Sequence, residues 1–416
     1  GSRGSRCARR PPARTAPITV RSVPDAAVPQ EPTWVGDDAA LDEAVGTLLT
    51  AERYALDTEF QGERTYYPTL ALVQLSDGEH IWLVDPLACD IARLRPLLEG
   101  PGTMLAHAAR QDLEILVREV GCAPARLVDT QIAAAFAGAG NQSLLTLCKR
   151  HLGVTLEKGD RLTDWLRRPL TAEQCEYAAS DVAHLLDLHD RLDGRLRAEG
   201  RESWAHDAFV ELLGKPVSGT DPDAAWTRLK DVKVLKPRAR GVARSVAAWR
   251  ERRAMTIDIP VRQVLPDLAV LGIAQKQPRT TSELSQARGV DDRHTRGNIA
   301  KELLEAVAAG LAMEAPLPPA DGEELERSLR PAVALVSAWV SEVARQERID
   351  TALLATRSDL VALLRGDADG VVVVPRELAA KIVGEAQAKV DAEAERMNQI
   401  GRGELVQGWV AEGLRS

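Results

Sequence analysis

The stretch ALDTEFQGERTYYP, residues 55–68, begins as a buried strand and then places two carboxylates, Asp57 and Glu59, two positions apart. Residues two apart in a β-strand point to the same side of the sheet. Two acids side by side repel each other, and unpaired charges in an apolar setting are costly. The pattern therefore leaves two interpretations open: a strand end in solvent, or a pair of acids that binds a cation.

The segments around this stretch predict a mixed-sheet α/β domain. Strands are predicted over residues 53–60, 70–76, 78–86 and 102–108, and helices over 91–100, 110–121, 141–153 and 171–199. Neighbouring strands followed by strand–helix alternation are typical of this class. After residue 200 the strand pattern ends and helical periodicity takes over.

Two further acids lie where they could complete a site. Asp112 falls at the start of a predicted helix, and Asp181 lies on the helix that begins with a capping box from Thr171 to Gln174. Tyr177 precedes Asp181 by four residues and so shares its helix face. Carboxylates are the ligands that Mg²⁺ prefers, and two such ions can activate a water and stabilise a leaving oxygen. Spacing alone does not show that the four acids converge, and each taken singly is typical of a solvated surface position.

Three segments resemble known motifs. Residues 56–76, 106–116 and 177–186 are similar, in order, to the three exonuclease motifs of the DEDD superfamily, and the Tyr-x-x-x-Asp spacing is that of its Tyr subclass. The segment 162–181 is similar to the corresponding part of the ribonuclease D family. The resemblance implies a ribonuclease H-like mixed-sheet fold and a two-metal site.

The resemblance also assigns roles to residues. Asp57, Glu59, Asp112 and Asp181 correspond to the ligands of two divalent ions, Mg²⁺ or Mn²⁺, and Tyr177 to the residue that positions the attacking water. All five positions carry the family's residues, which favours an active enzyme. Asp129, also usual in the family, is interpreted as structural.

Four nearby residues are weaker candidates for RNA contact. Phe60 could stack on the terminal base, because stacking on an aromatic ring tolerates any base, or it could belong to the core. His107 is more often a hydrogen-bonded structural group than a ligand at such a position. Arg161 and Arg168 could contact phosphates, or they could only fix the start of the 171–199 helix.

The charge distribution divides the chain. Residues 37–225 carry a net charge of −14, whereas residues 226–314 carry +7. Basic clusters bind phosphates with little sequence preference. The block resembles an HRDC domain, the helical module of RecQ helicases and of ribonuclease D. We therefore predict RNA contacts along this block, at residues Lys230, Lys233, Lys236, Arg238 and Arg240.

The chain of 416 residues is too long for one ordinary domain. The predicted order is a disordered basic tail (1–33), a DEDD exonuclease domain (34–212), a linker (213–224), an all-α HRDC domain (225–314) and a divergent second HRDC-like helical domain (325–416). Five widely spaced cysteines predict a cytoplasmic protein, and the lack of a long apolar run predicts that it has no membrane segment. We also expect a monomer.

These observations predict a metal-dependent 3′-5′ exoribonuclease, and the resemblance implies that it trims the 3′ ends of tRNA precursors and other structured RNAs. Two alternatives remain at this point. One is a DNA exonuclease of the same superfamily, because recognition of the 2′-hydroxyl depends on geometry rather than on a motif. The other is a non-catalytic RNA-binding scaffold.

Overall fold

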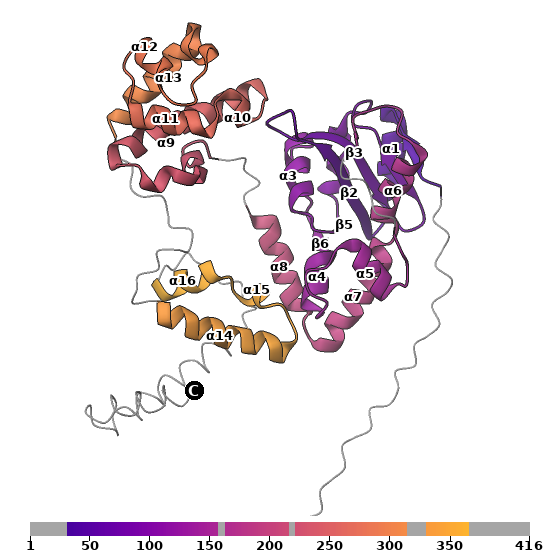
Figure 1. Ribbon diagram of the computed structural model, residues 1–416. Helices are drawn as coiled ribbons and strands as arrows, with labels where there is room; N and C mark the ends of the chain where they lie inside the picture. Colours follow the sequence, from indigo (N-terminus) through magenta and orange to yellow (C-terminus); the bar gives the residue numbers. More distant parts are fainter. Residues whose placement is uncertain (1–30, 157–162, 216–220, 314–329, 366–416) are drawn as a thin grey trace, which may run out of the picture.

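The structure is a computed structural model that describes residues 31–156, 163–215, 221–313 and 330–365. Its N-terminal part is built on a six-stranded mixed sheet of order β1-β4-β3-β2-β5-β6 (Figure 1). The strands are β1 (Thr33–Val35), β2 (Arg53–Gln61), β3 (Thr69–Ser76), β4 (Ile81–Val84), β5 (Thr103–Ala106) and β6 (Leu127–Asp129). The prediction of a mixed-sheet α/β domain is confirmed, although the short strands β1 and β6 were missed.

Helices cover both faces of this sheet. The helical segments of this part are α1 (Asp38–Leu48), η1 (Ile91–Leu94), α2 (Arg95–Leu98), α3 (Arg110–Glu119), α4 (Thr130–Phe136), α5 (Leu144–His151), α6 (Ala172–Ala183), α7 (Leu185–Glu199) and α8 (Glu202–Gly214). One core cluster joins α1 and α3 to the side chains of Tyr54 and Leu56. A second cluster joins α6 to Ala55, which alternates to the other face. Strand β2 is thus buried between two layers of helices.

The predicted single helix over 171–199 is wrong in one respect. The structure ends α6 at Ala183 and starts α7 at Leu185, with His184 outside the helical region at φ −115° and ψ 5°. The predicted capping box is present, since the Thr171 side chain accepts from the Gln174 amide and the Gln174 side chain accepts from the Thr171 amide. The break lets α6 lie over β2, β3 and β4 while α7 turns toward β5.

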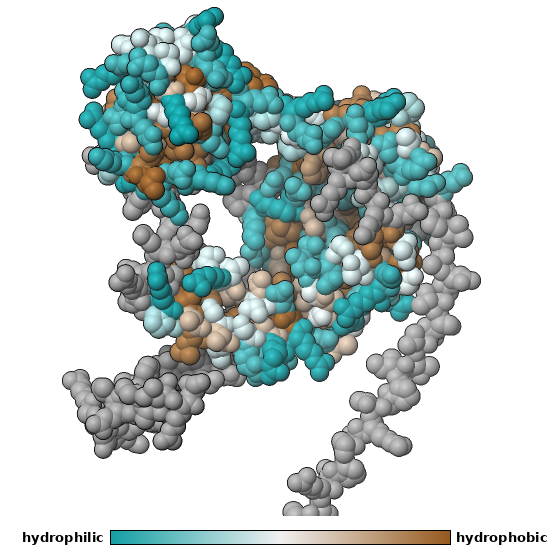
Figure 2. Space-filling view, viewed as in Figure 1, coloured by the Kyte–Doolittle hydropathy of each residue, from teal (hydrophilic) through white to brown (hydrophobic). Residues whose placement is uncertain are grey.

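The second part is entirely helical within its described residues, as predicted. Its elements are η2 (Ala225–Arg228), η3 (Lys230–Val234), α9 (Pro237–Ile257), α10 (Val261–Val264), α11 (Asp267–Lys276), α12 (Thr281–Ser285), η4 (Asp292–Thr295) and α13 (Gly297–Leu311). Helices α9 and α13 approach closely because Gly241 faces Gly310; a Cβ on Gly241 would lie 2.6 Å from the Gly310 carbonyl oxygen. Residues of hydrophilic type dominate the visible face of this part (Figure 2).

The third part shows α14 (Arg330–Glu347), α15 (Thr351–Leu354) and α16 (Arg357–Arg365). It contacts the N-terminal part through Arg201, whose guanidinium donates to the carbonyl oxygens of Phe136 and Glu347. The proposed tail and most of the predicted second HRDC-like domain lie outside the described residues. No helix in the part of the chain that the structure describes is long and apolar enough to cross a membrane.

The loop between β2 and β3 contacts the helical part. The Tyr66 hydroxyl donates to the Glu251 carboxylate at 2.7 Å, and Asp258, just after α9, accepts from the backbone amides of Tyr66 and Tyr67 at 3.0 Å each. A cavity of about 820 Å³ lies at this junction and is also lined by Arg118. The strand that carries the acid pair is therefore connected to the second part through its own hairpin loop.

Candidate active site

The acid pair lies on the α6 face of the sheet. Asp57 pairs across the ladder with Gln74, and Glu59 pairs with Leu72. The register between β2 and β3 shifts directly after Glu59. Such a bulge bends a strand and re-aims its side chains. The pair thus lies where β2 leaves its regular pairing, and both side chains are half-buried.

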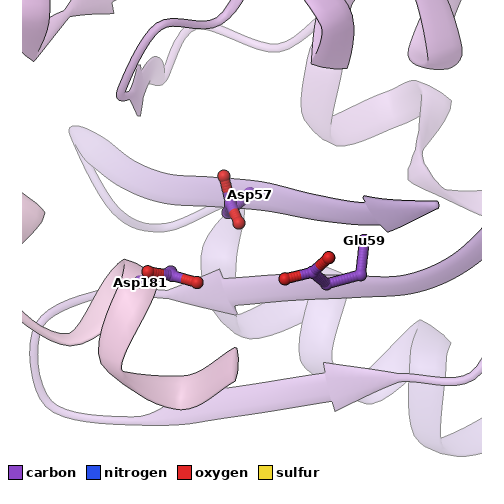
Figure 3. A group of neighbouring side chains, drawn as sticks. All are labelled: Asp57, Glu59 and Asp181. Atoms are coloured by element: carbon purple, nitrogen blue, oxygen red, sulfur yellow. The ribbon is translucent and has the colours of Figure 1, made fainter. Parts of the chain in front are cut away.

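Asp181 joins this pair from α6. One carboxylate oxygen from each of Asp57, Glu59 and Asp181 can be chosen so that all three lie within 4.8 Å of one another (Figure 3). Asp181 is far from Asp57 and Glu59 in the sequence, so its convergence with this pair is a product of the fold. The arrangement fits a hard divalent cation, which takes carboxylate oxygens as ligands.

The pKa values of the three carboxylates are raised, as expected for a group of acids that binds a cation. Burial, and then the charges of Asp112, Asp181 and Glu59, raise the pKa of Asp57 well above its usual value. Burial and neighbouring acids likewise raise the pKa of Glu59 to about 8 and that of Asp181 to about 7. Like charges crowded at a partly desolvated site favour protonation unless a cation compensates them.

Asp112 lies beside this group but is not one of the three. It is buried in the first turn of α3, and the Thr58 hydroxyl donates to its Oδ1 at 2.5 Å. Burial raises the pKa of Asp112 to about 6, and its charge raises the pKa of Asp57, Glu59 and Asp181. Asp112 is thus within electrostatic reach of the group of three, and its Oδ1 is held by the Thr58 hydroxyl.

Asp129 explains how the start of α3 is placed. Its carboxylate accepts from the amides of Ala108 and Ala109 ahead of α3, and from Gln131 and Ile132 in the first turn of α4. One buried side chain therefore joins the two helix starts. This is the structural role that the sequence analysis gave to Asp129.

Tyr177, the predicted water-positioning residue, lies beside Asp181. Its hydroxyl hydrogen-bonds to Asp181, one turn further along α6, and its ring lies 6.0 Å from that of Trp165. Burial and the neighbouring acids, Asp181 first among them, raise the pKa of Tyr177, so the phenol keeps its proton. A protonated hydroxyl at this place can orient a water beside the acid cluster.

The structure describes three of the four weaker candidates for RNA contact, Phe60, His107 and Arg168. Phe60 is half-buried and packs against the main core cluster on the α3 side. His107 is half-buried, with Nδ1 3.0 Å from the Thr130 hydroxyl. Both therefore have structural contacts, and no observation adds RNA contact to them. Arg161 lies outside the described residues.

Arg168 is a correction to the predicted phosphate contacts. Its Nε and Nη2 donate to the Asp85 carboxylate at 2.8 and 2.6 Å, and Nη2 also donates to the Ala71 carbonyl at 2.7 Å. The guanidinium also lies over the ring of Trp34. A fully engaged guanidinium fixes the chain ahead of α6 and is not free for phosphate.

Arg240 is the second correction. It is buried, and its Nη1 donates to the Leu235 carbonyl at 2.6 Å, so it holds the start of α9. The other four predicted contacts, Lys230, Lys233, Lys236 and Arg238, are exposed. These four are available to a polyanion and form the basic strip referred to below.

Comparison with known proteins settles the family. The chain matches the 3′-5′ exonuclease family over residues 32–197 and the HRDC domain over residues 239–307. Ribonuclease D of Granulibacter bethesdensis is 36% identical over 325 residues, which is 76% of this chain and 82% of the relative. The chain belongs to the ribonuclease D family. The ribonuclease D of Gluconacetobacter diazotrophicus is 37% identical over 79% of this chain and 85% of its own length.

A solved ribonuclease D structure shows the same fold. The crystal structure of Escherichia coli RNase D, described as an exoribonuclease involved in structured RNA processing, matches with a TM-score of 0.73 and 32% identity, covering 80% of this chain and 90% of that one. The predictions of a ribonuclease D-type 3′-5′ exonuclease and of an HRDC domain are confirmed.

Two residues that hold groups at the ribonuclease D site were not predicted from the sequence. Thr58 contacts Asp112, and Asp85 anchors Arg168. Thr58 stands between the two acids of β2, and alternation along the strand turns it toward α3, which carries Asp112. That signal was in the sequence. Asp85 precedes a proline and had no comparable signal.

Proposed function

We propose that this ribonuclease D family member removes nucleotides from the 3′ ends of tRNA precursors and other structured RNAs and releases nucleoside 5′-monophosphates. The observation that carries the proposal is the convergence of Asp57, Glu59 and Asp181, with the Tyr177 hydroxyl bonded to Asp181. We further propose a cytoplasmic monomer, an inference that rests on the sequence.

The chain's own residues define the chemistry. Asp57, Glu59 and Asp181, with Asp112 beside them, would hold two divalent ions, Mg²⁺ or Mn²⁺. Such ions lower the pKa of a bound water and stabilise the leaving oxygen of a phosphodiester. Tyr177 orients the attacking water through its retained proton. Thr58 and Asp129 fix Asp112 and its helix, and Arg168 fixes the entry to α6.

The basic strip supplies the RNA contact in this proposal. The nuclease segment carries the excess of acids, and the helical segment carries the excess of bases. Lys230, Lys233, Lys236 and Arg238 are exposed and would contact the phosphates of the RNA body. Division of the charge lets the acidic part hold cations while the basic part holds the polyanion.

Site variants test the proposal. With Mg²⁺ and a single-stranded RNA, Asp57→Asn and Asp181→Asn should each lower turnover by at least about 100-fold, because each removes a charge that compensates the ions. Asp187→Asn, at an exposed position of α7, is the matched control and should retain activity. Degradation of RNA at the wild-type rate by Asp57→Asn would contradict the site assignment.

A matched DNA strand tests the alternative function. Faster cleavage of DNA than of RNA would favour a DNA exonuclease.

A further inference from the structure

Gln74 is a buried residue whose side-chain amide has no partner among the residues that the structure describes. It is fully buried in β3, and neither Nε2 nor Oε1 makes a hydrogen bond to any of those residues. Buried polar groups are nearly always hydrogen-bonded, because a donor or acceptor removed from water without replacement lowers stability. An amide that leaves both atoms unsatisfied therefore needs a reason for its presence.

The position of Gln74 suggests that reason. Gln74 is the residue directly opposite Asp57 in the antiparallel β2–β3 ladder. Directly opposite residues project on the same face, with Cβ atoms about 5 Å apart. On its other side Gln74 pairs with Leu83 of β4, which belongs to the cluster beneath α6. The amide thus lies on the sheet face that carries the acid cluster.

The sheet face that carries Gln74 also carries a hydrophobic cluster. It includes Leu72, Leu83, Ala178 and Val182, and the Tyr177 ring packs against it. A leucine or methionine would satisfy this environment without any unpaired polar atom. The polar neighbour that the ladder provides is Asp57, which accepts hydrogen bonds when it is ionised.

We propose that Gln74 is a positioning residue for Asp57: its Nε2 donates to the Asp57 carboxylate when that carboxylate binds a cation, and so fixes its orientation. The inference rests on the proposed function, because it requires Asp57 to be a metal ligand. Partners of metal ligands orient them, and their removal typically lowers metal affinity or activity about 10- to 100-fold. In the cation-free protein the same amide is a source of instability.

This dual role predicts effects of opposite sign. Gln74→Met keeps the approximate length of the side chain and removes both polar atoms. In EDTA the variant should unfold at the same temperature as wild type or a few degrees higher, because an unsatisfied amide is gone. In calorimetric titration of the full chain with Mn²⁺, its affinity should be about 10-fold weaker or worse.

The control variants separate positioning from packing. Leu72→Met changes the neighbouring position of the same strand face, opposite Glu59, without removing a polar group, and such swaps are well tolerated. It should bind Mn²⁺ as wild type does. Gln74→Leu is a second apolar variant in case Gln74→Met does not fold. Either one that folds should show the weakened Mn²⁺ binding.

Two outcomes would overturn the proposal. Mn²⁺ affinity within about twofold of wild type in Gln74→Met would show that the amide is merely unsatisfied. A clear loss of thermal stability in EDTA would show that the amide has a structural partner in the cation-free protein. Failure of the proposed function is distinguishable, since Asp57→Asn would then also bind Mn²⁺ and degrade RNA as wild type does.

Discussion

The guanidinium of Arg168 holds the carboxylate of Asp85 through two hydrogen bonds, of 2.8 and 2.6 Å, across the space between the chain ahead of α6 and the end of β4. The Asp85 side chain is only 8% exposed. This pair, with the Ala71 carbonyl as a third acceptor, ties the chain ahead of the Asp181-bearing helix to the sheet. Arg168 was predicted to contact phosphate, and these hydrogen bonds give it a structural role instead.

Removal of Arg168 should therefore affect stability more than RNA binding. Arg168→Ala leaves a buried carboxylate without its partner, and such changes cost about 3 kcal/mol. The free energy of unfolding in urea measures this destabilisation. Arg167→Ala, at the exposed neighbouring position, should lie within about 0.5 kcal/mol of wild type. A stable Arg168→Ala protein with a weaker salt dependence of RNA binding would return Arg168 to the RNA interface.

Tyr177 should act on turnover and not on cation binding. Tyr177→Phe keeps the ring against Trp165 and removes the hydroxyl that bonds Asp181. Removal of a group that orients the attacking water should lower kcat by about 100-fold. Affinity for Mn²⁺, measured by calorimetry, should change little. Glu176→Gln, on the exposed side of α6, is the control; an equal drop in kcat in this variant would remove the special role of Tyr177.

The stability of the cation-free protein should fall as the pH rises. The pKa values of Asp112, Asp181 and Glu59 are raised to about 6, about 7 and about 8 from ordinary values near 4. Between about pH 4 and pH 8 the folded protein thus binds more protons than the unfolded chain, so deprotonation favours unfolding. Thermal unfolding in EDTA should show a lower Tm at pH 8.5 than at pH 5.5.

Divalent cations should reverse this trend, because they bind the deprotonated carboxylates and stabilise the folded state. With Mg²⁺ the Tm should rise most at pH 8.5. Asp57→Asn, which removes one of the repelling acids, should flatten the pH dependence in EDTA. A Tm in EDTA that is higher at pH 8.5 than at pH 5.5 would contradict the electrostatic description of the cluster.

The basic strip should govern the salt dependence of RNA binding. Replacement of Lys230, Lys233, Lys236 and Arg238 by Gln should weaken binding to single-stranded RNA. The slope of log K against log salt should become shallower by about 0.7 for each phosphate that the variant no longer neutralises. Filter binding at several salt concentrations measures this slope. Unchanged affinity and slope would remove the RNA-binding role given to the strip.

The sequence predicted the fold class, whereas the contacts of the predicted site residues follow from tertiary structure. Alternation along β2 and the capping box at Thr171 are local signals, and both are present in the structure. The convergence of Asp181 with Asp57 depends on the packing of α6 over β2, β3 and β4, which no local pattern encodes. Sequence spacing alone therefore did not show that the acids form one site, and the family resemblance supplied their roles.

Arg168 and Arg240 are residues whose role the sequence predicted wrongly. Both were predicted RNA contacts because basic residues near a nuclease favour phosphate, yet each donates to groups within the chain. Whether an arginine is free depends on acceptors brought near it by tertiary structure, and here these include Asp85 and a helix-start carbonyl. Charge runs in a sequence do not distinguish these cases.

The most direct test of the central claim is degradation of one RNA labelled at its 5′ end or at its 3′ end, with Mg²⁺ and with EDTA. We predict that the 5′ label passes through a ladder of shortening products, that the 3′ label appears at once as a nucleoside 5′-monophosphate, and that EDTA abolishes both. Immediate release of the 5′ label, internal cleavage, or full activity in EDTA would contradict it.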